Sequence, residues 1–398
     1  MTMARLQYIV LDGGLCGWLA GLVLARHLEG TGIGVQVDEQ PEHCTADALY
    51  AASHDEVLPF LRQLGVTERL LLTQCNAGYT LGVRIEGLRD IPLCGLGLDW
   101  RGTAFLRHLQ RCRDLRSGEE AIRFSTGAVA MAHGRFAPLD QRNRIGTLQH
   151  AVGLHVDPSK LRDLVKGLAI AAGVEHGRIE GRGVLRIITK PLRSVEAKLG
   201  QGHCAPYTAV SRSFDQAQVS LAEGDVLSIY APQTESMEDP WQEGALRIGP
   251  ASMTAPMEVF GPWRLFLNEL SWLVDLLPAE VPAFAEARQY GCLFRTARDE
   301  LTSMSGHLRG EKIQGDDLFS KRGFLMPSDG ELFTSLDWTK AFLARDCIPE
   351  HTDPMAERSD RETIAREITA LEARITAVVR NFPPYAKYLD AVRRAAGA

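Results

Sequence analysis

A cluster of small residues near the amino terminus has the composition of a nucleotide-binding turn. The segment 12–17, Asp-Gly-Gly-Leu-Cys-Gly, follows the apolar run 6–11. Glycines at this spacing let the backbone approach a pyrophosphate, and the N–H groups of a following helix then neutralise its charge. An acid about 20 residues further on accepts hydrogen bonds from a ribose in such sites. The candidate cofactor-binding residues are therefore Gly13, Gly14, Gly17, Trp18 and Glu39.

Hydrophobic patterning around this turn predicts a strand, a helix and a second strand. Residues 6–11 form an apolar strand pattern, residues 18–28 repeat apolar side chains at helical spacing, and residues 34–38 form a β-run. This order predicts a βαβ unit of the Rossmann type. Asp12, however, stands where Gly-x-Gly-x-x-Gly has its first glycine, and its side chain and charge are unfavourable for phosphate binding. The alternative interpretation is a βαβ unit that serves only as core.

Other segments predict elements along the rest of the chain. Asp157 and Pro158 are typical of a helix start, here before residues 160–172. A helix over 362–380 is expected to face the core or a partner through one apolar stripe, which consists of Ile364, Ile368, Leu371, Ile375 and Val378. We also expect helices over 56–64, 265–277 and 284–308, strands over 79–85 and 174–184, and a mixed, reduced β-layer over 191–245.

Composition and charge argue against several classes of protein. The 398 residues carry a net charge of −6 and are 45% hydrophobic, which is typical of soluble globular proteins without a nucleic-acid partner. No apolar run has the about 20 residues of a membrane span, so we expect a cytoplasmic protein with no membrane partner. The eight cysteines form no Cys-x-x-Cys pair and the histidines are dispersed, which predicts reduced thiols and no metal site. Glu258 and Glu269 receive no acid or base role.

Three segments of the sequence resemble segments of the flavin-dependent tryptophan halogenases. In the first, residues 11–18 read Leu-Asp-Gly-Gly-Leu-Cys-Gly-Trp, with glycines before a Gly-Trp pair. In the second, residues 76–85 read Asn-Ala-Gly-Tyr-Thr-Leu-Gly-Val-Arg-Ile, which is similar to a strand of that family. In the third, residues 153–161 read Gly-Leu-His-Val-Asp-Pro-Ser-Lys-Leu, which is similar to its Tyr-His-Phe-Asp helix start. The resemblance touches most of the chain.

This resemblance implies a fold, a cofactor and a reaction. The implied fold is α/β, with a Rossmann-like FAD-binding core of the flavin monooxygenase or halogenase type, a reduced substrate β-layer and a C-terminal helical region. We divide the chain into an N-terminal core part (1–190), the β-layer (191–245), a return segment of the core (246–310) and the helical region (311–398). In the family, reduced FAD and oxygen oxidise chloride or bromide, a lysine guides the halogen to an aromatic substrate, and a separate reductase supplies the reduced flavin.

Several motifs of the family are altered here. The position of the lysine falls at Thr80, which has no amine, so no catalytic residue is assigned. The Gly-x-Gly-Glu-x-Thr loop that packs on the flavin falls at residues 47–52, which contain neither glycine nor glutamate. The Pro-x-x-Ser-Thr-Gly turn falls at residues 262–267, where bulky side chains replace small ones. Since a flavin site requires close backbone approach, we expect FAD binding to be weak or lost.

These departures favour a halogenase-like protein that has lost FADH2-dependent halogenation. We expect it to bind a ligand or a partner in a tailoring or natural-product pathway. The expected partner is an aromatic small molecule, a peptide, another protein or a second copy of the chain. The alternative is an active, divergent halogenase or monooxygenase that uses FADH2 on a tryptophan-like or indole-like substrate and requires a flavin reductase.

Overall fold

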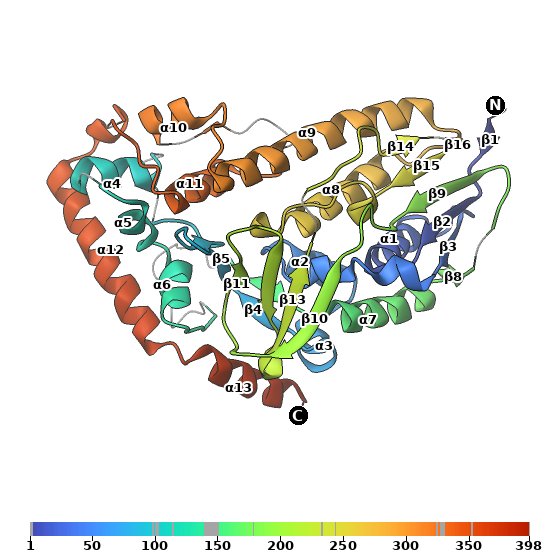
Figure 1. The fold of residues 1–398 in the computed structure, drawn as a ribbon, viewed down its shortest axis with the longest axis horizontal. Coiled ribbons are helices and arrows are strands. Elements are labelled where there is room, and N and C mark those ends of the chain that lie inside the picture. Colours follow the sequence, from blue (N-terminus) through green and yellow to red (C-terminus); the bar gives the residue numbers. More distant parts are fainter. Residues whose placement is uncertain are drawn as a thin grey trace.

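A mostly parallel sheet forms one end of the molecule (Figure 1). The computed structural model describes residues 3–397 except 98, 100–102, 114, 139–150, 178, 232–233, 243, 324, 327–330 and 352. The strand order of this sheet is β14-β15-β9-β2-β3-β8, and only β14 is antiparallel to its neighbour. The strands are β2 (Tyr8–Asp12), β3 (Gly34–Asp38), β8 (Glu175–His176), β9 (Val184–Ile188), β14 (Trp241–Gln242) and β15 (Ala245–Arg247). The expected βαβ opening is confirmed.

Two helices pack together beside this sheet. Helix α1 (Gly14–His27) follows β2 directly and contacts β3 and helix α7 (Pro158–Ala171). The carboxylate of Asp157 accepts hydrogen bonds from the backbone N–H groups of Ser159 and Lys160, and Pro158 occupies the first helical turn, so the predicted helix start is confirmed. Helix α1 is buried on nearly all sides, which explains why it lacks a polar face.

A second sheet contains four strands from residues 191–245, where a β-layer was expected, together with two strands from earlier in the chain. Its order is β10-β13-β12-β11-β5-β6. The strands are β5 (Gly82–Ile85), β6 (Ile91–Pro92), β10 (Glu196–Gln201), β11 (Thr208–Val210), β12 (Gln216–Ser220) and β13 (Asp225–Tyr230). The expected strand over 79–85 is interrupted at Leu81: β4 (Gly78–Thr80) instead pairs with β7 (Gly153–His155). The central strands of this sheet bury Val210, Val219 and Ile229 in the core.

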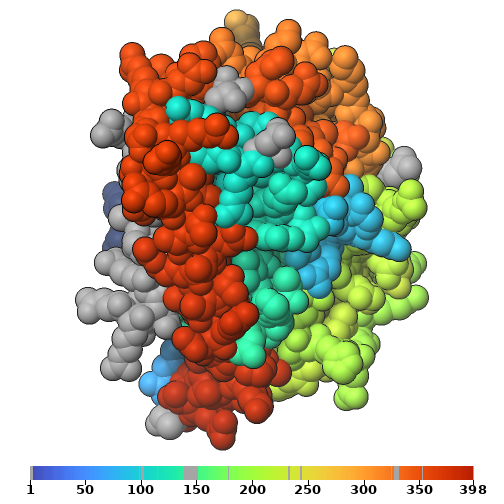
Figure 2. Space-filling view, turned by 90° about the vertical axis from the view of Figure 1, so that its left-hand side faces the viewer, coloured from blue at the N-terminus to red at the C-terminus, as the bar shows by residue number. Residues whose placement is uncertain are grey.

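Helices from residues 105–132 and from the C-terminal region form the other end of the molecule, at the left of Figure 1. Figure 2 shows α12 crossing the face formed by α4, α5 and α6. The bounds are α4 (Phe105–Arg113), α5 (Gly118–Ile122), α6 (Thr126–Ala132), α8 (Gly261–Asp275), α9 (Phe284–Arg309), α10 (Asp316–Arg322), α11 (Ser335–Ala344), α12 (Arg361–Asn381) and α13 (Tyr385–Gly397). The apolar stripe of α12 is buried from Ile364 to Ile375, but its last buried member is Val379, not Val378.

The remaining elements are short. They are α2 (Val57–Gln63), α3 (Glu68–Gln74), β1 (Ala4–Arg5), β16 (Glu280–Val281) and the 3-10 helices η1 (Pro41–Cys44), η2 (Asp47–Tyr50), η3 (Ala222–Gly224), η4 (Gly249–Ala251), η5 (Met257–Val259) and η6 (Ala356–Arg358). All eight cysteines are free thiols. Among the described helices, none combines the length and the apolar character needed to cross a bilayer.

Candidate functional site

The glycine turn lies between β2 and α1 and is packed tightly against its surroundings. Gly14 has a positive φ of +78°, which favours glycine. A Cβ atom on Gly17 would lie 1.8 Å from the carbonyl oxygen of Asp12. A Cβ atom on Gly13 would lie 2.7 Å from the Cα atom of Glu39. The three glycines therefore let the chain approach itself, and the space beside the turn is filled by protein atoms.

Two hydrogen-bond donors of this turn, the N–H groups of Gly13 and Leu15, are used within the chain. The N–H group of Gly13 donates to Nδ1 of His43 (3.1 Å) and to the carbonyl oxygen of Asp38 (3.0 Å). The N–H group of Leu15, in the first turn of α1, donates to a carboxyl oxygen of Asp47 (2.8 Å). The first N–H groups of a helix normally bind an anion or a capping group. Here an acidic side chain from η2 occupies that place.

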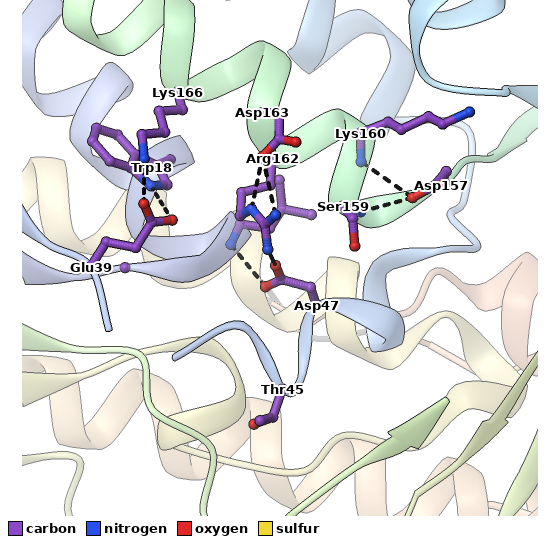
Figure 3. A network of polar contacts seen from close by, with 12 residues as sticks. Trp18, Glu39, Thr45, Asp47, Asp157, Ser159, Lys160, Arg162, Asp163 and Lys166 are labelled. Carbon is purple, nitrogen blue, oxygen red and sulfur yellow. Dashed lines mark hydrogen bonds and ion pairs between the residues drawn. The ribbon is translucent and has the colours of Figure 1, made fainter. Parts of the chain in front are cut away.

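Asp47 is held in the turn by an ion pair as well as by the backbone of α1. Its other carboxyl oxygen lies 3.3 Å from the guanidinium of Arg162 on α7, as Figure 3 shows. Asp47 is only 5% exposed. Burial raises the pKa of Asp47 to about 7, although the Leu15 N–H group and Arg162 both act to lower it. This side chain therefore links η2, α1 and α7 from inside the protein.

Glu39, the expected ribose-binding acid, also has partners within the chain. Its carboxylate accepts a hydrogen bond from the indole N–H of Trp18 (3.0 Å) and forms an ion pair with Lys166 (Figure 3). The ammonium of Lys166 lies 5.1 Å from the centre of the Trp18 ring, within the range of a cation–π interaction. Burial opposes ionisation, but Lys166 and Trp18 lower the pKa of Glu39 overall. All five candidate cofactor residues thus lie together, and each contacts protein atoms.

This arrangement does not fit the pyrophosphate of FAD. Two backbone donors of the turn bind His43 and Asp47. Asp12 points a further acidic group at the turn, where one of its oxygens lies 3.9 Å from Nε2 of His43. The nearby cations Arg162 and Lys166 are each engaged by a carboxylate. A phosphate that binds the Leu15 N–H group would have to displace Asp47.

The region expected to pack on the flavin ring is an aromatic core. Tyr50, Trp263 and Phe266 are each at most 1% exposed, and the rings of Tyr50 and Trp263 meet edge to face with their centres 5.3 Å apart. The indole N–H of Trp263 donates to the carbonyl oxygen of Tyr50 (2.9 Å). The prediction that residues 262–267 correspond to a flavin-binding turn is wrong, because these residues form the first turns of α8. The strained turn lies just before them, where Phe260 has a positive φ of +56°.

Thr80, at the position expected for the lysine of the family, is completely buried at the end of β4. Its hydroxyl donates to the carbonyl oxygen of Gly82 (3.0 Å). A Cβ atom on Gly153, its partner in β7, would lie 2.8 Å from the Thr80 methyl group. The site therefore has no free polar group and no room for a longer side chain without local rearrangement.

A second group of buried charges surrounds a small cavity between β5, β6, α8, α9 and α11. The cavity has a volume of about 30 Å³, room for about one water molecule. One carboxyl oxygen of Glu258 binds the Ser305 hydroxyl, and the other has no hydrogen-bond partner among the described residues. Lys340 and Arg264 line the same cavity, and both contact Asp337, at 3.1 and 3.6 Å.

The second group combines a buried carboxyl group with a carboxylate that is paired with a lysine and an arginine. Burial raises the pKa of Glu258 and so favours its protonated form. Burial disfavours ionisation of Asp337 as well, but Lys340 and Arg264 hold the pKa of Asp337 well below its ordinary value. No acid or base role could be predicted for Glu258 from the sequence, and no role was predicted for Lys340. The sequence feature that could have pointed to Lys340 is its position within the apolar run 338–344, which forms part of α11.

No group of three or more metal-ligating side chains occurs in the part of the chain that the structure describes. The two clusters of buried charged residues described above are the candidate sites. The first, at the glycine turn, consists of Asp47, Arg162, Glu39, Lys166 and Trp18. The second, around the 30 Å³ cavity, consists of Glu258, Lys340, Arg264 and Asp337.

Known proteins share this fold over nearly the whole chain. BrvH, a flavin-dependent halogenase from Brevundimonas sp. BAL3, is 16% identical, with a TM-score of 0.80 over 98% of this chain and 99% of its own. Xcc4156, a flavin-dependent halogenase from Xanthomonas campestris, is 15% identical, with a TM-score of 0.80 over 97% and 98%. The tryptophan 6-halogenase SttH from Streptomyces toxytricini is 14% identical, with a TM-score of 0.77 over 98% and 100%.

Sequence comparison gives a consistent result. The family model of the tryptophan halogenases matches residues 7–194, which include the glycine turn and helix α7. No curated protein matches the sequence significantly. The low identities agree with the altered motifs at Thr80 and at residues 47–52. The first part of the chain therefore matches the tryptophan halogenase family model, and nearly the whole chain shares the fold of flavin-dependent halogenases at low sequence identity.

Proposed function

We propose that this protein has kept the halogenase fold but does not use it for FADH2-dependent halogenation. Its function is then to bind an aromatic ligand, a peptide or a protein partner. The observation that carries the proposal is the Asp47 carboxyl group at the N-terminus of α1, in the place where a dinucleotide would put its phosphates. The cofactor on which the whole reaction depends therefore has no prepared site.

Two further features support the loss of halogenation. Thr80 supplies no amine, and its buried surroundings leave no room for one. The aromatic core of Tyr50, Trp263 and Phe266 fills the region expected to face the flavin ring. Each feature affects a different step of the family reaction, so restoring a single residue would not restore activity.

A flavin titration tests the proposal. We expect no saturable quenching of FAD fluorescence by the purified protein up to roughly 100 µM, and binding at micromolar or lower concentrations would refute the proposal. Asp47→Ala removes the side chain that occupies the α1 N-terminus and frees Arg162. A charge-assisted hydrogen bond contributes about 1.5–3 kcal/mol, so the variant should bind FAD at least about tenfold more tightly than the wild type.

The matched control is Asp163→Ala. Asp163 also contacts Arg162, at 3.1 Å, but its side chain is 68% exposed and touches no part of the glycine turn. This variant should bind FAD as poorly as the wild type. Equal affinities of the Asp47 and Asp163 variants would mean that another part of the turn excludes the cofactor, and that Asp47 does not carry the effect.

A second candidate function is favoured by the cavity at Glu258. A buried carboxyl group with a raised pKa and a free oxygen, next to Lys340, is an arrangement found at catalytic sites. An active, divergent halogenase or monooxygenase with an aromatic substrate and a separate flavin reductase would use these groups. Mass spectrometry after incubation with reduced FAD, bromide and indole distinguishes the two functions. A product absent from the Glu258→Gln variant would support the enzyme and refute the binding protein.

A further inference from the structure

A cavity of ligand size lies at the helical end of the molecule, apart from the two candidate sites. Its volume is about 560 Å³, within the range of about 300–1,000 Å³ that small-molecule sites occupy. Its walls come from the turn between β5 and β6, from α5 and α6, and from α12. Figure 2 looks onto the face that α5, α6 and α12 form. None of the residues that line this cavity belongs to the glycine turn or to the group around Glu258.

Part of the cavity wall is apolar. Ile122 of α5 and Ala128 of α6 are buried, and Leu88 and Val129 are half-buried. None of these four side chains carries a polar atom. Because water gains few hydrogen bonds against such a wall, this part of the cavity favours the apolar body of a ligand.

The charged groups of the cavity favour an anion over a cation. Each of its three carboxylates is held by an arginine, in the pairs Asp90–Arg84, Glu119–Arg89 and Glu372–Arg113, at 2.8, 2.9 and 2.7 Å respectively. A ligand ammonium would therefore compete with an arginine for its partner. Arg123 is less fully engaged, since its side chain is 55% exposed and one of its nitrogens lies 3.3 Å from Glu119. Its other N–H groups can bind a ligand carboxylate, and His133 is a second basic group with no acidic partner among the described residues.

Arg89 has the properties of a stacking platform for an aromatic ring. Its guanidinium is held by Asp346 (3.3 Å) and by Glu119 (2.9 Å). Hydrogen bonds to a guanidinium lie in its plane, so they leave its two faces free. No aromatic side chain in the part of the chain that the structure describes covers Arg89. A guanidinium fixed in this way binds a flat aromatic ring better than a flexible aliphatic chain.

We propose that this cavity binds an aromatic carboxylate, with the ring between Arg89 and the apolar wall and the carboxylate on Arg123. The inference rests on the proposed ligand-binding function, and it gives the aromatic ligand of that function a place and a chemical class. The apolar wall contributes affinity for any aromatic molecule, whereas Arg123 selects those that carry a negative charge.

Isothermal titration calorimetry with four probes of similar size tests the class of ligand. The aromatic carboxylate 2-naphthoate should bind with a dissociation constant of about 0.1–1 mM, as expected for a molecule of this size. The neutral 2-naphthylmethanol, the cationic 2-naphthylmethylammonium and the aliphatic carboxylate decanoate should each bind at least about fivefold more weakly. Absence of 2-naphthoate binding up to about 5 mM would overturn the proposal. Equal or tighter binding of any of the other three probes would overturn it as well.

Two variants at exposed positions test the place of binding. Arg123→Glu should weaken 2-naphthoate binding at least about tenfold and leave 2-naphthylmethanol binding unchanged, a selective effect that unfolding would not produce. Its matched control is Arg116→Glu, an exposed charge reversal outside the cavity, which should bind both probes like the wild type. Ala132→Trp fills the cavity and should abolish binding of both probes, whereas Ala171→Trp, on the exposed end of α7, should not.

These variants decide whether the binding site is the cavity. Unchanged 2-naphthoate binding in Arg123→Glu or in Ala132→Trp would overturn the proposal, provided that circular dichroism shows both variants to be folded. No flavin is present in these titrations. Failure to bind 2-naphthoate would therefore refute the assigned ligand site, whereas only the FAD titration bears on the proposed loss of halogenation.

Discussion

Replacing Glu269 by glutamine tests whether a buried carboxyl group of α8 is protonated in the folded protein. Glu269 is completely buried. Its carboxyl oxygens lie 2.5 Å from the Gly249 nitrogen and 2.6 Å from the Ser252 hydroxyl. The same hydroxyl lies 2.9 Å from the carbonyl oxygen of Gly249 and has only one hydrogen to donate. If it donates to that carbonyl group, Glu269 must carry a proton of its own.

The magnitude follows from the pKa of this group. Burial raises the pKa of Glu269 to about 8 from an ordinary value of 4.5. Between these two values the unfolded chain loses the proton while the folded chain keeps it, so the free energy of unfolding falls as pH rises from about 4.5 to about 8. At 1.36 kcal/mol for each pKa unit, the total effect is about 5 kcal/mol, of which about 4 kcal/mol falls between pH 5 and pH 8.

Urea unfolding of the wild type and of Glu269→Gln at several pH values measures this effect. The glutamine has nearly the shape of the protonated acid but does not titrate. The wild type should therefore lose stability relative to the variant as pH rises, by up to about 4 kcal/mol between pH 5 and pH 8. Glu238→Gln, at an exposed site, should show no such divergence. Parallel pH profiles for the wild type and Glu269→Gln would refute the reasoning.

Three further predictions concern other sites. Leu371→Ala on α12 removes a buried side chain that packs toward α4, so the free energy of unfolding should fall by about 2–5 kcal/mol in urea denaturation; a change below about 1 kcal/mol would contradict the packing. Gly17→Ala places a Cβ atom against the Asp12 carbonyl group and should strongly lower the melting temperature. Gly167→Ala, on an open face of α7, should raise stability by about 0.5–1 kcal/mol; similar effects of both alanines would disprove the steric argument. Thr80→Lys should yield no brominated indole with reduced FAD and bromide, because only one of several altered sites is repaired; brominated product above a peroxide control would show that the flavin site is intact.

Local sequence patterns predicted the elements but missed some of their ends. The strand at 34–38 was predicted with the bounds that β3 has, because its alternation and flanking turns are local signals. Helix α8 begins four residues earlier than expected, at Gly261, since Pro262 is favourable in a first helical turn. The resemblance to the tryptophan halogenases was based on short segments such as Gly17-Trp18. The match to the family model and the shared fold confirm this resemblance.

Tertiary structure determined which side chains meet in the two candidate sites. The sequence by itself determined the βαβ opening, the cap of α7, most of the stripe of α12 and the resemblance to the halogenases, because the patterns behind them involve residues close together in the chain. Only the fold decided that Asp47 binds the α1 N-terminus 32 residues away, and that Lys340 shares a cavity with Glu258. Such contacts join residues that are far apart in the chain, and no local pattern in the sequence marks them. The glycines of the turn were visible, but only the packing revealed that the chain itself occupies the space they create.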